Sequence, residues 1–177
     1  MLNMKFKKII YFVLIIFSFS FIKLSADTPY FIDFKYILNE SDAGKKAQTF
    51  LKNKLEKGFK DIKEKEKKIQ DEEKKIIQQK KLVSAEEYKK KVTDLRKKVS
   101  NLQKERNEIL KSIASKRAKA KNELLKNLNP IMKNYMKEKN IKMIVDKKSL
   151  LLADENLNIT KDIMSLLNKQ LKSINLN

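Results

Sequence analysis

Apolar residues recur at helical spacing through the middle of the chain, where polar residues outnumber them. Residues 45–83 hold no proline and a single glycine, Gly58, and helix-forming residues dominate them, which predicts one long helix. Its apolar positions recur every seven residues, whereas the positions that would complete a coiled-coil seam are polar (Glu66, Glu73 and Lys80). Such a helix is unstable alone and must lie against a partner. The recurring apolar positions are Ile62, Ile69, Ile76 and Val83.

A second helical segment follows directly. Ser84 stands three residues before Glu87, a capping-box spacing that starts a helix at Ala85. The segment reaches Asn129 and Pro130, where we expect a bend or a restart, with the asparagine as N-cap and the proline as first helical residue. Its seam positions are separated alternately by four and three residues and include a single polar residue. They are Tyr88, Val92, Leu95, Val99, Leu102, Arg106, Ile109 and Ile113.

The helix start at Ser84 lies near the midpoint of the two segments. The simplest arrangement is an antiparallel coiled-coil hairpin whose tip lies at about 82–85. The alternative that the pattern leaves open is one uninterrupted parallel coiled coil through both segments. Gly58 in the first helix is either a flexing point or a tolerated defect, since glycine costs about 1 kcal/mol relative to alanine in a helix.

Short apolar segments flank the hairpin and predict a small β-containing body. Residues 30–34 are aromatic and β-branched and predict a strand, and residues 35–40 predict one helical turn that the sequence SDAG then breaks. Residues 141–146 and 149–153 predict a strand pair. Thr160 is the predicted N-cap of a closing helix over 161–172, which has Ile163, Leu166, Leu167 and Leu171 on one face.

We therefore expect a fold that is mainly α with a small β part (α+β), in which the hairpin projects from a small β-strand oligomerisation body. The body comprises residues 27–44 and 130–177, and the arm comprises residues 45–129. Three short strands leave edges and apolar faces that are too small to stand alone, which favours an oligomer. The residues predicted to build its shared body are Phe31, Ile32, Phe34, Ile144, Val145 and Leu151.

The first residues have the pattern of a secretory signal peptide. Lys5, Lys7 and Lys8 precede the apolar run at 9–22, and Ala26 ends a small-residue cleavage pattern. We expect cleavage after Ala26 and, in a bacterium, export to the periplasm. The alternative is an uncleaved anchor, although the apolar run is shorter than the roughly 20 residues that a membrane span needs.

Composition excludes several kinds of chemistry. The 177 residues include no Cys, no His and only two Gly, which leaves no thiolate or imidazole metal site, no Ser-His-Asp triad and no glycine-rich phosphate loop. We therefore predict no catalytic, cofactor-binding or metal-binding residues. Asp33 and Asp146 end or interrupt apolar segments, and strand-end capping explains them better than a catalytic dyad does.

The net charge is +20, from 42 Lys and Arg against 22 Asp and Glu. All but three of the cations, Arg96, Arg106 and Arg117, are lysines. This excess either reflects A/T-rich codons or provides a surface for acidic partners, and in both cases it attracts polyanions at low salt. Candidate client contacts near the hairpin tip are Ile77, Lys80, Lys81 and Leu82, although the two apolar ones can also pack within the hairpin.

Three stretches of the sequence resemble the Skp/OmpH-like family of periplasmic chaperones. They are FIDFKYILNESDAGKKAQ at 31–48, LVSAEEY at 82–88 and MIVDKKSLLLADENLNITKDIMSLLN at 143–168. The last resembles the family's strand ending in Val-Asp, followed by an apolar strand and an Ile-Thr entry to the final helix, although Asn158 stands where Asp is expected. The resemblance implies an ATP-independent holding chaperone, a homotrimer whose hairpins enclose unfolded outer-membrane β-barrel proteins and prevent their aggregation during transport to the outer membrane.

Other functions compete with this one. An uncleaved segment 9–22 would make the chain a membrane-tethered structural or adaptor protein of the cell envelope. A polyanion binder is a further alternative, but the few Arg residues and the export signal disfavour nucleic acid. A secondary contact with acidic lipid or lipopolysaccharide stays open.

Overall fold

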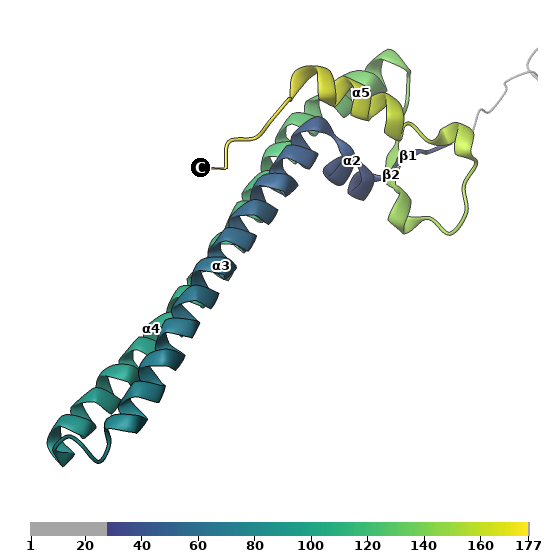
Figure 1. The fold of residues 1–177 in the computed structure, drawn as a ribbon. Coiled ribbons are helices and arrows are strands. Elements are labelled where there is room, and N and C mark those ends of the chain that lie inside the picture. Colours follow the sequence, from purple (N-terminus) through teal and green to yellow (C-terminus); the bar gives the residue numbers. More distant parts are fainter. Residues whose placement is uncertain (1–27, 177) are drawn as a thin grey trace, which may run out of the picture.

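The computed structural model describes residues 28–176, so the predicted signal peptide over residues 1–26 lies outside the described residues. Two long helices, α3 (Asp42–Gln79) and α4 (Ala85–Glu138), lie side by side and project from a small body at one end (Figure 1). Residues 80–84 join them at the far end. The predicted fold class, an antiparallel helical hairpin with a small β part, is confirmed, and the continuous rod is excluded.

The arms begin at serine caps. Ser84 Oγ accepts a hydrogen bond from Glu87 N at 3.1 Å, as the capping box predicts, and α4 begins at Ala85. Ser41 Oγ accepts one from Gly44 N at 3.2 Å and caps α3 in the same way. The sequence SDAG ends α2 as expected, although only Ser41 is non-helical and the next three residues form the first turn of α3. The break is this short because the buried Ser41 side chain caps the new helix at once.

Helix α4 continues through Pro130 to Glu138 as one element, so the predicted restart at Asn129 and Pro130 is wrong. Leu128 and Ile131 flank the proline and are 0% and 3% exposed in the body core. Burial of these side chains outweighs the loss of one backbone hydrogen bond at the proline. The helix ends at Glu138, and Asn140, two residues later, has a φ of 53°, while Ile141 N donates to Met136 O at 2.8 Å. Both features are typical of a left-handed helix C-cap.

The sheet has two strands within the described residues, β1 (Tyr30–Ile32) and β2 (Ile144–Asp146), which pair in parallel with Tyr30 opposite Ile144. The predicted strand over 30–34 is shorter because Asp33 caps α2 (Phe34–Glu40), the helical turn expected at 35–40. The predicted strand over 149–153 is wrong. A 3₁₀ turn, η2 (Lys147–Ser149), follows β2 directly and ends where the strand was predicted to begin. Asp146 starts this turn, because its Oδ1 accepts a hydrogen bond from Lys148 N at 3.3 Å.

The body core forms where α5 (Thr160–Gln170) lies against α2 and α4, after a second 3₁₀ turn, η3 (Glu155–Leu157). Ile163 and Leu167 of α5 are fully buried with Leu128 of α4 and Ile37 of α2. The apolar face predicted for the closing helix therefore faces the core. Tyr135 on α4 donates a hydrogen bond to Asp162 Oδ2 at 2.7 Å, and partial burial together with this bond raises the pKa of Tyr135 to about 12.

Thr160 has a different role from the one predicted. The N-cap of α5 is Ile159, which makes no side-chain cap bond, and Thr160 is already helical. Its hydroxyl accepts a hydrogen bond from Asp33 N at 2.8 Å and donates one to Asn158 Oδ1 at 2.6 Å. The threonine therefore joins the end of β1 to the start of α5, and the prediction of an N-cap was wrong.

Candidate functional site

The seam between the arms is thinly packed. Ile62, Ile76 and Ile113 are the buried seam residues, at 3%, 6% and 7% exposed. The other apolar seam positions of α4 nearer the tip are only half-buried, and Val99 is 51% exposed. Because few side chains are removed from water along the arm, most of its surface stays available to a partner.

Charged residues set the register of the hairpin. Lys65 pairs with Glu105, and Glu72 pairs with Lys98 at 2.6 Å. These side chains are 38–52% exposed, so each pair contributes little, roughly 0.2–1 kcal/mol. Their value is geometric, since they hold equal lengths of the two helices opposite each other.

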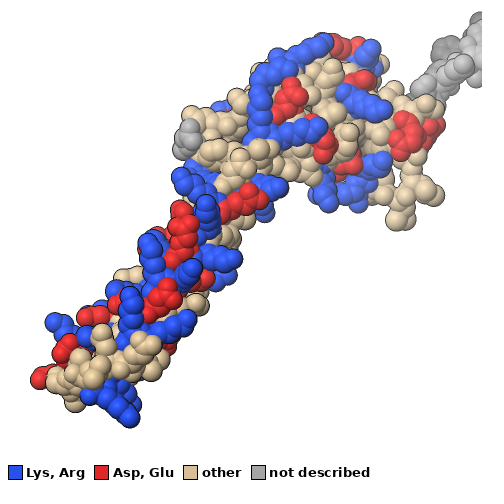
Figure 2. Space-filling model, in the orientation of Figure 1, with Lys and Arg blue, Asp and Glu red and all other residues tan. Residues whose placement is uncertain are grey.

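Two of the polar positions that interrupt the predicted seam, Glu66 and Arg106, face each other. Arg106 on α4 lies 3.8 Å from Glu66 on α3, and its guanidinium lies 5.6 Å from the centre of the Phe59 ring. Figure 2 shows Lys and Arg spread along the whole visible face of the arm, with Asp and Glu between them. The arm therefore presents a lysine-rich surface with intervening acidic residues.

Gly58 marks a close approach of the two arms. A Cβ built on Gly58 would lie 3.1 Å from two side-chain carbons of Ile109 on α4. The glycine therefore makes room for the isoleucine, a role that neither the flexing point nor the tolerated defect describes. Its position on the face of α3 that also carries Leu55, Phe59 and Ile62 is the signal that would have indicated this.

Replacing Gly58 with leucine will lower the free energy of unfolding by about 1–3 kcal/mol, because the new side chain must displace Ile109 or separate the arms. Thermal unfolding followed by circular dichroism measures the change. Lys60→Leu adds a leucine at an exposed position of the same helix and serves as the control. Equal stability of the two variants would contradict the close approach.

The four residues proposed for client contact lie at the far end of the arm. Ile77 and Leu82 are 60% and 82% exposed, so neither is packed within the hairpin. Lys80 and Lys81 are also exposed, and Lys80 Nζ lies 5.8 Å from the centre of the Tyr88 ring. The tip therefore combines accessible apolar and cationic groups, and its contact with clients stays a prediction.

The residues proposed for the shared body divide into three groups by their exposure. Phe31 and Ile32 are 2% and 5% exposed and are buried within the single chain. Phe34, Ile144 and Val145 are partly buried and line a groove of about 460 Å³ beside three methionines, Met132, Met136 and Met143. Leu151 and its neighbour Leu152 are 102% and 95% exposed. Contact of these groups with a second subunit stays a prediction.

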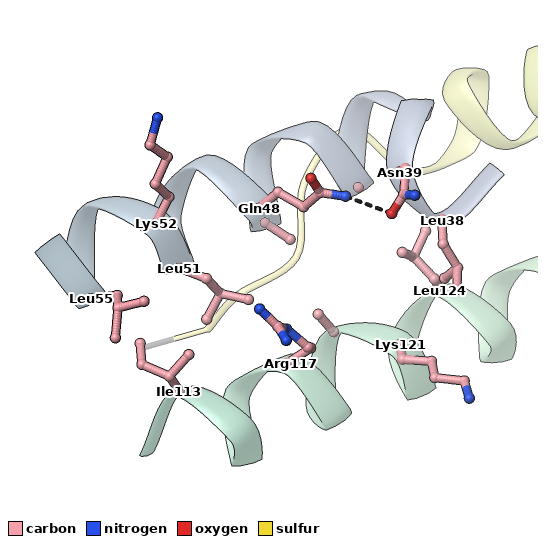
Figure 3. A pocket seen from close by; sticks show the side chains of 13 residues that line it. Leu38, Asn39, Gln48, Leu51, Lys52, Leu55, Ile113, Arg117, Lys121 and Leu124 are labelled. Atoms are coloured by element: carbon pink, nitrogen blue, oxygen red, sulfur yellow. Dashed lines mark hydrogen bonds between the residues drawn. The ribbon is translucent and has the colours of Figure 1, made fainter. Parts of the chain in front are cut away.

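Sequence reasoning missed the packing of the C-terminal residues. Leu176 is 3% exposed and packs at the root of the hairpin, and Ile174 packs there as well. The available signal was the alternation of apolar and polar residues in SINLN at 173–177. A groove of about 640 Å³ also opens between α3 and α4 at the root of the hairpin (Figure 3).

The two candidate aspartates are caps. Asp33 Oδ1 accepts a hydrogen bond from Tyr36 N at 2.8 Å, and Asp146 caps η2. Over residues 28–176, His, Cys, Asp and Glu form no group of three that is suited to hold a metal ion. In the same part of the chain, every helix is too short or too polar to cross a membrane.

The helical hairpin and its small body are also found in a known protein structure. A model of the family described as "Outer membrane protein (OmpH-like)" matches residues 30–167. The chain belongs to the OmpH-like family. The fold of this OmpH-like protein is similar to the crystal structure of an OmpH-like outer membrane chaperone from Caulobacter crescentus, with a TM-score of 0.77 and 16% sequence identity over 84% of this chain and 89% of that one. A search of curated proteins gives no match.

Proposed function

We propose that this OmpH-like protein is an ATP-independent periplasmic holding chaperone. In this proposal it is exported by a signal peptide that is cleaved after Ala26, which N-terminal sequencing of the mature protein tests. Three subunits join through their bodies, and their arms enclose an unfolded outer-membrane β-barrel protein. Family membership carries the proposal, and the exposed lysine-rich arm supports it.

The physical case for a trimer rests on the body. A two-stranded sheet of three residues per strand is too small to be stable alone. The outer edge of β1 already bridges to Asn158, but within residues 28–176 no strand covers the outer edge of β2, which can pair with another chain. Leu151 and Leu152 lie next to this sheet in the sequence and are almost completely exposed. A neighbouring subunit that covers both would stabilise the assembly by about 1.5–3 kcal/mol for each leucine.

Changing Leu151 and Leu152 together to aspartate will weaken trimer assembly by at least about 100-fold, since two apolar side chains become charged ones that resist burial. Sedimentation of the variant over a range of concentrations measures the shift from trimer to monomer. Asn101→Asp, an exposed change on the arm that adds one negative charge, serves as the control. Unchanged assembly of the leucine variant would remove these residues from the interface.

Client holding would rely on many weak contacts. Lysine side chains attract acidic clients over a distance and cover apolar segments with their aliphatic stems while remaining hydrated. Ile77 and Leu82 at each tip add apolar contacts, and three arms acting together give avidity without a deep pocket. A secondary contact with acidic lipid or lipopolysaccharide uses the same lysines.

An aggregation assay tests the proposal. A urea-denatured outer-membrane β-barrel protein is diluted into buffer with and without this protein, and light scattering is followed at about 50 mM and about 500 mM salt. We expect suppression to saturate near one trimer per client and to weaken at the higher salt. Full aggregation at every ratio and both salt concentrations would refute the chaperone function.

A further inference from the structure

The last six described residues leave α5 and lie along the root of the arms, where Figure 1 shows them in yellow. Leu176 is 3% exposed and packs against a strip formed by both helices. Ile174 contacts this strip and also the body core. We name residues 171–176 the tail, and we name the four buried residues beneath Leu176 the root strip. The root strip consists of Ala47, Leu51, Ile113 and Ala120.

One polar contact of the tail is made to its backbone. Lys116 Nζ donates a hydrogen bond to the backbone carbonyl of Leu176. Desolvation lowers the pKa of Lys116, and the neighbouring Lys54 and Lys119 lower it further. Lys172 also forms an ion pair of 2.8 Å with Asp42, and the two side chains are 64% and 42% exposed. Any extended peptide that presents a carbonyl at the same place can replace the tail at Lys116.

The tail has the pattern of a membrane β-strand. Ile174 and Leu176 alternate with the polar residues Ser173 and Asn175, and residues 172–176 form neither helix nor strand. Strands of outer-membrane barrels alternate in the same way between an apolar outer face and a polar inner face. The tail is therefore a segment of the same chemistry as the clients of the proposed function.

The contacts of the tail favour its release. It is short, it forms neither helix nor strand, and the ion pair of Lys172 with Asp42 is exposed and screened by salt, so it belongs to the parts of a protein that open at low cost in free energy. Apolar surface also adjoins the root strip along the arm. A groove of about 780 Å³ shares Ile113 with the root strip and is lined as well by Phe50 and Ile109, which pack against the same cluster as Leu176.

We infer that the root strip is a binding site for extended client segments with alternating apolar residues, and that the tail occupies it as a built-in competitor when no client is bound. The inference rests on the proposed function, since it names a site for the same clients. A client strand that displaces the tail gains the root strip, the carbonyl contact with Lys116 and the adjoining groove. The tail lowers the apparent affinity of the root strip for a client, because only the fraction of molecules with a released tail can bind the client.

A variant with a released tail tests the inference. Ile174→Ser with Leu176→Ser keeps the length and charge of the chain and removes both anchors, and a chain that ends at Lys172 provides a second form. Ser173→Ala, at an exposed tail position, is the matched control. The probe is a fluorescent peptide with the sequence of residues 171–177, whose binding is followed by fluorescence anisotropy. The same variants are compared in the aggregation assay.

We expect the peptide to bind both released forms about tenfold more tightly than it binds the unmodified chain and the control. Adding Lys116→Met to a released form should weaken peptide binding severalfold. Released forms should also hold clients at lower protein concentration. Absence of peptide binding in the released forms, with clients held equally by all variants, would overturn this inference alone. In another outcome the peptide binds, but neither the variants nor the unmodified chain hold clients. This result would refute the proposed function and with it the kind of client assigned to the root strip.

Discussion

Replacing Gly44 with alanine will unfold the junction between the arm and the body. A Cβ at this position would lie 2.1 Å from the backbone oxygen of Leu38 and 2.9 Å from Ser41 Oγ. The oxygen belongs to the last turn of α2, and the serine caps α3, so neither can move without breaking the sharp turn between the two helices. We expect a loss of at least about 3 kcal/mol, the upper range for overpacking a core.

Chemical denaturation of Gly44→Ala beside Gly58→Ala measures this effect. The second variant is a fair control because its new Cβ meets only the flexible side chain of Ile109 at 3.1 Å, and alanine favours the helix by up to about 1 kcal/mol. The first variant should be largely unfolded at a temperature where the second is intact. A Gly44→Ala protein with native stability would show that the turn between α2 and α3 differs from the one described.

Shortening both arms will abolish most client holding while leaving the body intact. Deleting residues 63–76 and 94–107 removes two heptads from each helix and keeps the tip, with Ile77, Leu82 and the Ser84 cap. Equal deletions preserve the register that the pairs Lys65–Glu105 and Glu72–Lys98 define. Because three arms would act together on one client in the proposed trimer, the loss of contacts along them should lower the effective affinity for clients by at least about tenfold.

Light scattering with a denatured barrel protein measures the loss, and sedimentation checks that the shortened protein assembles as the full-length one does. A second variant, Ile77→Ser with Leu82→Ser, keeps the arm length and separates the contribution of the tip. A shortened protein that suppresses aggregation as well as the full-length chain would place client binding in the body and contradict the role of the arms.

Elements whose residues interact locally were predictable from the sequence. The heptad spacing predicted two helices, and the Ser84–Glu87 capping box located the start of the second one within a residue. The unusual polar seam residue Arg106 was visible in the sequence, but its pairing with Glu66 was not. That pairing depends on the register of two helices, which a pattern within one helix does not contain.

Features that depend on distant parts of the chain were mispredicted. Pro130 reads as a helix boundary, but the buried neighbours Leu128 and Ile131 hold α4 together through it. Threonine is a common N-cap residue, but the hydroxyl of Thr160 accepts a hydrogen bond from the backbone amide of Asp33, which lies far away in the sequence. The apolar segment 149–153 has the composition of a strand, yet in the described single chain its leucines face solvent. In each case tertiary contacts override local preference.

The candidate site was predictable only in part. The sequence placed Ile77 and Leu82 off the seam but left open whether they pack within the hairpin, and the structure shows that both are exposed. The packing of Leu176 on the root strip was not predicted, because a short polar tail with two apolar residues is typical of an unstructured chain end. The room that Gly58 leaves for Ile109 was not predicted either, because only the place of the glycine on the apolar face of α3 pointed to it, and the position of Ile109 opposite depends on the register of the two helices.

Native mass spectrometry of the complex with an unfolded outer-membrane barrel protein tests the central claim most directly. The purified mature protein is mixed with the denatured client by dilution, and the masses of the intact assemblies are recorded. The account predicts an assembly of three chains without client and of three chains with one client. A client bound to a single chain, or three chains that never carry a client, would contradict it.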